Sequence, residues 1–320
     1  MANRFARFWV EPLDAAGLRR YVLHREPGTE SVRASGPPPT VPTDAHGWPV
    51  SATWPGMQQP LFTSGLGDFV SVRVNAFAPR WALQDIWGAA GAAKRQLQEE
   101  KLAFIAGTPG GPTAFEETPH TLRYTQPLEH PRLAWATRRL EIWKREPRAR
   151  LTFRLNRRSS FDPELLCVVS PLPCDGTLPR LSSGGLGFTP FSDQMPGTCR
   201  DYFAIDGWAH YATPSGHWLW VTRDAPLITL DGPHPKSRIT APPPRTGRLL
   251  AILFDNFWYT NFQGDSPGVM EFQFDLVWRA ELADDREADA LAQTLTTDPV
   301  IVLNPALPEH PLLLEHLFRP

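Results

Sequence analysis

The sequence has little cysteine and no long apolar run. Its three cysteines, Cys167, Cys174 and Cys199, are odd in number and form no Cys-x-x-Cys pair. They therefore predict neither a disulfide framework nor a zinc ribbon. The N-terminal residues lack the apolar core of a signal peptide, and no stretch approaches the roughly 20 apolar residues of a membrane span. We expect a cytoplasmic protein with no membrane partner.

An excess of charge of either sign is also missing. The 320 residues include 32 Lys and Arg against 34 Asp and Glu, which gives a formal net charge of −2. This balance provides no electrostatic footprint for nucleic acid or anionic lipid. The basic side chains are nearly all Arg, which we attribute to codon bias rather than to a guanidinium-rich site.

Known catalytic motifs are absent too. There is no HExxH, GxSxG or Walker A pattern, and no GxGxxG between a strand and a helix. Ser183–Gly187 is glycine-rich, but no helix signal follows it that could hold a phosphate, so we expect a loop there. His210 and His217 flank a predicted turn and can meet on adjacent strands, either as a metal pair or as solvent-facing residues. We predict no metal site and no cofactor.

Proline and tryptophan are abundant, with 35 and 12 residues. Frequent proline disfavours long helices and favours short strands joined by turns. Each tryptophan is expected either to fill the core or to offer its indole face to the C–H face of a sugar. The composition therefore favours an all-β protein.

Alternation of apolar and polar residues predicts many strands, and two segments predict helices. The expected helices are 84–104 and 284–295, the second capped by Asp284. Long loops are expected at 31–60, 175–199 and 231–247. The expected strands are 4–10, 18–24, 69–77, 113–117, 120–126, 133–143, 148–156, 164–170, 201–212, 217–222, 226–230, 248–255 and 269–280.

These elements predict a large antiparallel β-sandwich with one or two short helices. We place the β-sandwich region at 1–282, which a break near 105–130 would divide into two sub-sandwiches. A short helix and a C-terminal tail occupy 283–320.

Three segments carry a distinctive pattern: Asp193–Trp208, Trp220–Leu227 and Phe254–Phe262, the last followed by Phe272-Gln273-Phe274. Together they resemble the C-terminal β-sandwich of bacterial glycoside hydrolase family 38 α-mannosidases. In that family an Asp-Ala-Pro-Leu run is followed by an Asn-x-Trp-x-Thr-Asn-Phe strand and then a Phe-x-Phe strand. The resemblance is specific over 130–280 and loose over 1–130, and it implies a mutarotase-like super-sandwich.

The same resemblance bears on catalysis. Enzymes of this family carry their Asp nucleophile and most of a His/Asp zinc site in an N-terminal barrel that opens with His-x-Asp. No His in this sequence is followed two residues later by Asp. We therefore assign no catalytic residue and expect the non-catalytic part of a mannosidase-like protein. Whether the chain is an enzyme by itself stays open.

Polar and aromatic residues of the three segments are candidates for sugar binding. Asn256, Trp258 and Thr260 share one face of a strand, as do Asp206 and Trp208. Each set also suits a core tryptophan among satisfied polar groups, and Asp224 also suits a turn. The candidate substrate-binding residues are Arg200, Asp201, Asp206, Trp208, Asp224, Asn256, Trp258 and Asn261.

Three functions compete. The first is an accessory module that binds carbohydrate and completes a glycosidase supplied by another chain. The second is a mutarotase-type enzyme, which needs a His acid and a carboxylate base in one groove; His210 or His217 with Glu271 is the available pairing. The third is a lectin-like binding protein.

Association with a separate catalytic polypeptide, or with a second copy, should leave an apolar face on the isolated chain. Tryptophans of the N-terminal third are the candidates to line that face: Trp9, Trp48, Trp54, Trp81 and Trp87.

Overall fold

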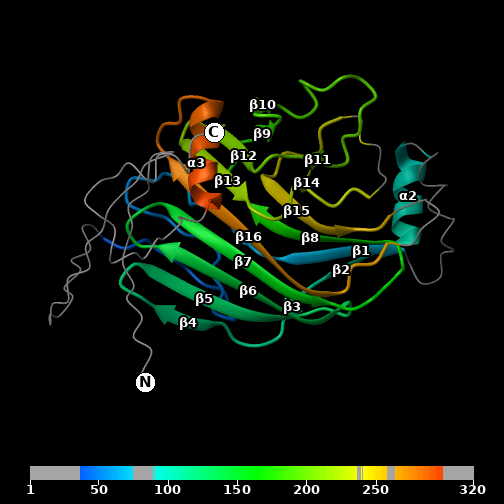
Figure 1. Cartoon of the computed structure of the whole chain (residues 1–320), viewed down its shortest axis with the longest axis horizontal. Coiled ribbons are helices and arrows are strands. Elements are labelled where there is room, and N and C mark those ends of the chain that lie inside the picture. The colour runs from blue at the N-terminus through cyan, green and yellow to red at the C-terminus, as the bar shows by residue number, and fades with distance from the viewer. Residues whose placement is uncertain are drawn as a thin grey trace, which may run out of the picture.

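Two antiparallel β-sheets pack face to face and form the body of the protein (Figure 1). The computed structural model describes residues 37–74, 89, 91–235, 239, 241–257 and 264–297. Within these residues only two short helices occur, so the expected all-β antiparallel sandwich is confirmed.

The smaller sheet has six strands in the order β11-β14-β15-β8-β1-β2. Its central strand β8 is buried along its whole length, which is the pattern of a strand covered on both faces. The bounds are β1 Phe69–Val74, β2 Leu102–Ala106, β8 Glu164–Pro171, β11 Phe203–Ala204, β14 Leu227–Leu230 and β15 Arg248–Asp255.

The larger sheet has ten strands. Nine follow the order β10-β9-β12-β13-β16-β7-β6-β5-β3, and β4 pairs with β5. The bounds are β3 Thr108–Pro109, β4 Ala114–Glu117, β5 Thr121–Glu129, β6 Leu133–Trp143, β7 Arg148–Arg157, β9 Arg180–Ser183, β10 Leu186–Phe188, β12 Trp208–Thr213, β13 Gly216–Thr222 and β16 Gly268–Arg279.

Aromatic side chains fill the space between the sheets. Phe69 of the smaller sheet stacks on Phe153 of the larger one, with 5.3 Å between ring centroids. Trp220 stacks on Phe274 at 5.4 Å, and its indole N–H donates to Ser170 on β8. Because these rings are almost completely buried, each contributes roughly 2–3 kcal/mol of hydrophobic stabilisation.

Helix α3 (Asp285–Thr296) covers part of the outer face of the larger sheet. It buries Ala288, Ala292 and Leu295 against a cluster that includes Trp208. Asp284 caps the helix by accepting from the backbone N–H groups of Arg286 and Glu287, as the sequence predicts. At the opposite end of the molecule, α2 (Gly91–Lys101) buries no side chain (Figure 1).

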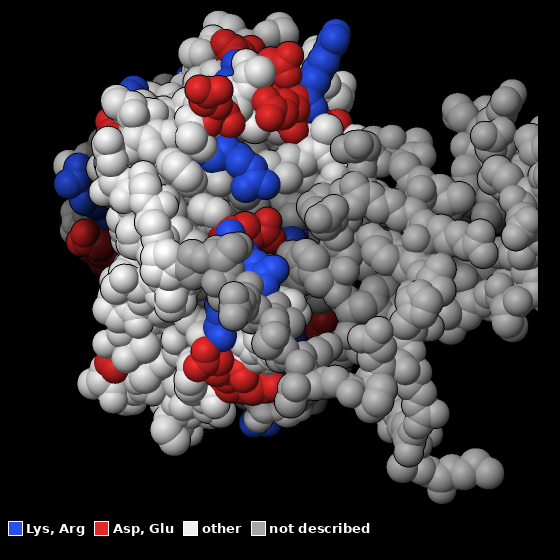
Figure 2. Space-filling model, turned by 90° about the vertical axis from the view of Figure 1, so that its left-hand side faces the viewer, with Lys and Arg blue, Asp and Glu red and all other residues white. Residues whose placement is uncertain are grey.

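The part of the larger sheet's outer face that α3 leaves uncovered carries charges of both signs. Arg148 and Arg150 of β7 both donate to Asp275 of β16, and Arg123 of β5 pairs with Glu141 of β6. Figure 2 shows acidic and basic side chains interspersed on the displayed side of the molecule. The alternation of Arg with apolar residues along β7 therefore reflects one charged and one buried face.

The segment before β1 carries two tryptophans into the core. Trp48 and Trp54 are 2% and 4% exposed, and their indole N–H groups donate to the backbone oxygens of Leu66 and Trp143. These two of the five candidate tryptophans therefore do not line an exposed apolar face. Trp9, Trp81 and Trp87 lie outside the described residues.

Three sequence predictions need correction. The strand expected at 201–212 is two separate strands, β11 in the smaller sheet and β12 in the larger one. The helix expected at 84–104 ends at Lys101 as α2, because residues from Leu102 onward pair with β1 as strand β2. Residues 84–88 and 90 lie outside the described residues. The loop expected at 175–199 contains the β9–β10 hairpin, whose turn places Gly184 and Gly185 at φ of 61° and 75°. The hairpin expected at 4–10 and 18–24 lies outside the described residues.

Among the described residues, no helix has both the length and the apolar character needed to cross a membrane.

Candidate functional site

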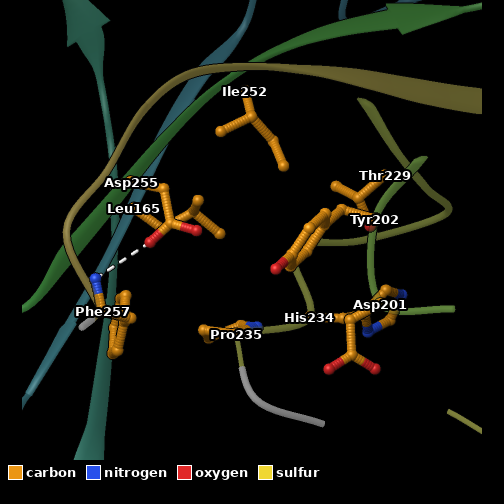
Figure 3. Close-up of a pocket in the computed structure, with 9 residues that line it drawn as sticks. All are labelled: Leu165, Asp201, Tyr202, Thr229, His234, Pro235, Ile252, Asp255 and Phe257. Atoms are coloured by element: carbon orange, nitrogen blue, oxygen red, sulfur yellow. Dashed lines mark hydrogen bonds between the residues drawn. The ribbon is translucent and has the colours of Figure 1, made fainter. Parts of the chain in front are cut away.

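A small pocket opens on the outer face of the smaller sheet, the face turned away from the central core (Figure 3). Its floor comes from β8 and β15, and its rim comes from the segments just before β11 and just after β14. The lining residues are Leu165, Asp201, Tyr202, Thr229, His234, Pro235, Ile252, Asp255 and Phe257.

Two of the three mannosidase-like segments meet at this pocket. The first contributes Asp201 and Tyr202, and the third contributes Asp255 and Phe257. Asp255 is the last residue of β15 and lies opposite Leu165 of β8, after a register shift between Ile252 and Phe254. The pairing of β15 with β8 thus places the start of the third segment in the floor of the pocket.

Tyr202 and Asp255 are the polar groups that face each other across the pocket (Figure 3). Burial raises the pKa of the Tyr202 phenol, and the nearby acidic groups of Cys199, Asp255 and Asp201 raise it further. A hydrogen bond with the Cys199 side chain raises it as well, so the phenol keeps its proton. Asp255 accepts from the backbone N–H of Phe257 at 2.9 Å.

His234 is held in one tautomer by the backbone. Its Nε2 lies 3.0 Å from the carbonyl oxygen of Leu230, so Nε2 carries the proton and donates. Burial lowers the pKa of His234, and the attraction of Asp201 and Asp231 opposes this only in part. The ring is therefore neutral near pH 7, with Nδ1 as an acceptor.

The volume of the pocket limits its chemistry. About 30 Å³ is room for roughly one water molecule. In this conformation the pocket can accept a single hydroxyl group between the phenol and the carboxylate, but it cannot enclose a sugar ring.

The structure places the predicted residues Asp201, Arg200 and Asn256 at or beside the pocket. Asp201 accepts from the backbone N–H of Ile239 at 2.8 Å, and the Arg200 guanidinium lies 5.5 Å from the ring centre of Phe191. Asn256 is 3% exposed. Its side chain accepts from the backbone of Glu164 and donates to the backbone of Gly264, so its amide serves the fold.

The other described candidates lie away from the pocket. Trp208 is 2% exposed under α3, so its indole has no free face for a sugar in this conformation. Asp206 accepts from the backbone N–H of Gly185, and Asp224 accepts from that of Gln273. Trp258 and Asn261 lie outside the described residues.

The two histidines of the larger sheet meet, as the sequence suggested. Nε2 of His210 lies 3.0 Å from Nδ1 of His217 in a stacked pair. Burial, and then the neighbouring His217, lower the pKa of His210 to about 4. Within the described ranges, no group of three or more His, Cys, Asp or Glu residues could hold a metal ion.

The His–carboxylate pairing considered for a mutarotase does not form. His217 lies opposite Arg279 on β16. Glu271, eight residues away on the same strand, is roughly 27 Å from that position, and it pairs with Arg154.

Sequence reasoning missed four polar residues of the pocket: Tyr202, Thr229, His234 and Asp255. Tyr202 and Asp255 stand directly beside the named candidates Asp201 and Asn256, so a broader selection within the same segments would have included them. His234 belongs to a proline-rich excursion and carries no local signal.

The sheets define an antiparallel β-sandwich, and two larger solved proteins contain a similar fold. Two solved structures match 80% of this chain with a TM-score of 0.51: an α-mannosidase from Enterococcus faecalis V583 and a glycosyl hydrolase family 38 protein from Enterococcus faecalis. Their sequence identities to this chain are 10% and 11%.

This similarity confirms the resemblance at the level of fold. The chain spans 30% and 31% of the length of those two proteins, so it corresponds to a part of each. No protein-family model matches the sequence, and no curated protein is similar to it.

Proposed function

We propose that this chain is the β-sandwich part of a mannosidase-like glycoside hydrolase and that it binds carbohydrate without a catalytic centre of its own. The observation that carries the proposal is the match of 80% of the chain to about 30% of an α-mannosidase. The catalytic part would be supplied from outside these 320 residues, by another polypeptide or by further chain. The match supports this division because it covers a part of a larger enzyme.

The pocket supports a role in binding rather than in bond cleavage. The Tyr202 phenol and the Asp255 carboxylate present polar oxygens to the pocket, which suit one hydroxyl of a saccharide lying over it. A volume of about 30 Å³ is too small for a reacting sugar ring to enter. The ligand would therefore rest on the surface and insert a hydroxyl.

The proposal includes a cytoplasmic location. All three cysteines are unpaired, and Cys167 and Cys174 are buried. Unpaired thiols suit a reducing compartment.

Saccharide titration tests the binding role. We expect calorimetry with α-mannobiose to show binding by the wild-type chain, and Tyr202→Phe and Asp255→Asn to weaken it by about tenfold, the effect of losing roughly 1.4 kcal/mol. Glu99→Gln, an exposed polar change on α2, is the matched control and should bind as the wild type does. Absence of saccharide binding by the wild type would refute the proposal.

A hydrolysis assay tests the non-catalytic part. The chain should release no product from an aryl α-mannoside above a buffer blank, with or without added zinc. Activity that co-purifies with the chain and is lost in Asp255→Asn would favour a stand-alone enzyme instead.

A further inference from the structure

An exposed tryptophan lies on the charged outer face of the larger sheet. Trp135 of β6 is 40% exposed, whereas its neighbour Ala136 points into the core. A register shift between Leu133 and Trp135 sets this orientation. The indole therefore stands on the side of the sheet that faces away from the other sheet.

Strand register places polar groups beside that ring. Trp135 lies opposite Asn156 of β7, and Asn156 lies opposite Val269 of β16. Since paired residues of antiparallel strands share a face, these three side chains form one row across the sheet. Two strand spacings separate Trp135 from Val269, roughly 10 Å.

The next row supplies hydrogen-bonding groups of both kinds. Thr137, Arg154 and Glu271 lie opposite one another on the same three strands. Nε of Arg154 is 2.9 Å from the Glu271 carboxylate, and the two side chains are 51% and 42% exposed. An indole is thus flanked by an amide, a hydroxyl and a solvent-facing guanidinium–carboxylate pair.

This end of the sheet has a rigid support. Arg157, next to Asn156, points inward with its side chain fully buried and pairs with Glu164 and Asp265. Asp265 also accepts from Ser159, so the approach to β16 is tied to the end of β7. A preorganised surface loses little entropy when a ligand binds.

The apolar area is too small for a protein partner. Trp135 at 40% and Val269 at 62% are the large apolar side chains exposed in these two rows. The indole offers at most about 100 Å² of apolar surface, given the roughly 150–250 Å² that an aromatic side chain can bury, and the smaller valine adds less. A stable interface needs about 800 Å² from each partner. A ligand with one C–H face and a rim of hydroxyls matches one ring surrounded by donors and acceptors.

We infer that Trp135, Asn156, Thr137, Arg154 and Glu271 form a platform for a neutral saccharide, with the sugar ring stacked on the indole. The inference rests on the proposed carbohydrate-binding function and adds a second contact surface to it. The pocket lies on the smaller sheet and the platform on the larger one, so different side chains test them.

The test uses the full chain and a linear α-mannotriose, with affinity measured by calorimetry. Trp135→Ala should bind at least about tenfold more weakly, whereas Trp135→Phe should stay within about threefold because an aromatic face remains. Phe104→Ala removes a ring that is 54% exposed on β2 of the other sheet and should bind as the wild type does. Circular dichroism melting of each variant checks that it is folded.

The outcomes separate the two ideas. Wild-type affinity in a folded Trp135→Ala variant overturns the platform and leaves the proposed function in place. No binding by the wild type overturns both. A wild-type dimer that Trp135→Ala converts to monomer in sedimentation shows a protein contact at this face and also overturns the platform.

Discussion

Replacing Arg157 with methionine should destabilise the protein strongly, because its side chain lies in a fully buried ionic cluster. Its guanidinium lies 3.3 Å from Glu164, pairs with Asp265 and covers the ring of Phe254. The side chains of Arg157 and Glu164 are both 0% exposed. Arg157→Met would leave a buried carboxylate whose remaining basic neighbours are Arg132, 3.5 Å away, and Arg73.

The expected loss is about 3–5 kcal/mol, the usual effect of removing one partner of a buried ion pair. That is a large part of the roughly 5–15 kcal/mol that stabilises a typical domain. The matched control is Arg154→Met, three residues earlier on the same strand. Its ion pair with Glu271 is solvent-exposed and should contribute no more than about 1 kcal/mol.

Urea unfolding followed by tryptophan fluorescence and circular dichroism provides the measurement. The two probes must report the same transition for the free energies to be compared, and the slope should be the same in all variants. A double variant, Arg157→Met with Glu164→Met, removes both charges and should recover part of the loss. If Arg157→Met costs no more than Arg154→Met, the reasoning about buried charge is wrong.

Two further predictions concern α3 and the histidine pair. Asp284→Ala removes the acceptor of two backbone N–H groups and should destabilise α3 by about 0.5–2 kcal/mol. Amide hydrogen exchange checks this: the α3 amides of Asp284→Ala should exchange faster than those of the control variant Glu281→Ala. Because the pKa of His210 is lowered from 6.5 to about 4, the unfolded chain binds more protons between these values, and stability should fall as pH drops through that window. His210→Gln should reduce this loss of stability at low pH. If the urea midpoint of the variant depends on pH as strongly as that of the wild type, the prediction is wrong.

Local pattern accounts for most strands and for α3. Alternation along 133–143 and 148–156 matches β6 and β7 almost residue for residue. The Asp284 cap marks the start of α3 because its side chain can satisfy backbone N–H groups within the same turn. The sequence pattern extends the helix past its C-terminal end at Lys101, because no local signal marks Leu102, where pairing with β1 replaces the helix.

The functional residues were harder to read from the sequence. By pattern, Trp208 and Asn256 suit a structural role as well as a sugar site. Burial under α3 and hydrogen bonding at the start of β8 give both a structural role in this conformation. The exposure of Trp135 cannot be predicted from alternation, because it depends on a register shift in β6.

The sequence by itself determined the all-β class, most strand positions and the cap of α3, because these depend on side-chain alternation and hydrogen bonds between near neighbours. Only the tertiary structure decided that β8 lies between β15 and β1, that Tyr202 faces Asp255, and that Trp135 stands beside Asn156. Those arrangements join residues far apart in the chain. Pairing between distant strands is set by how the whole core packs, which no short stretch of sequence specifies.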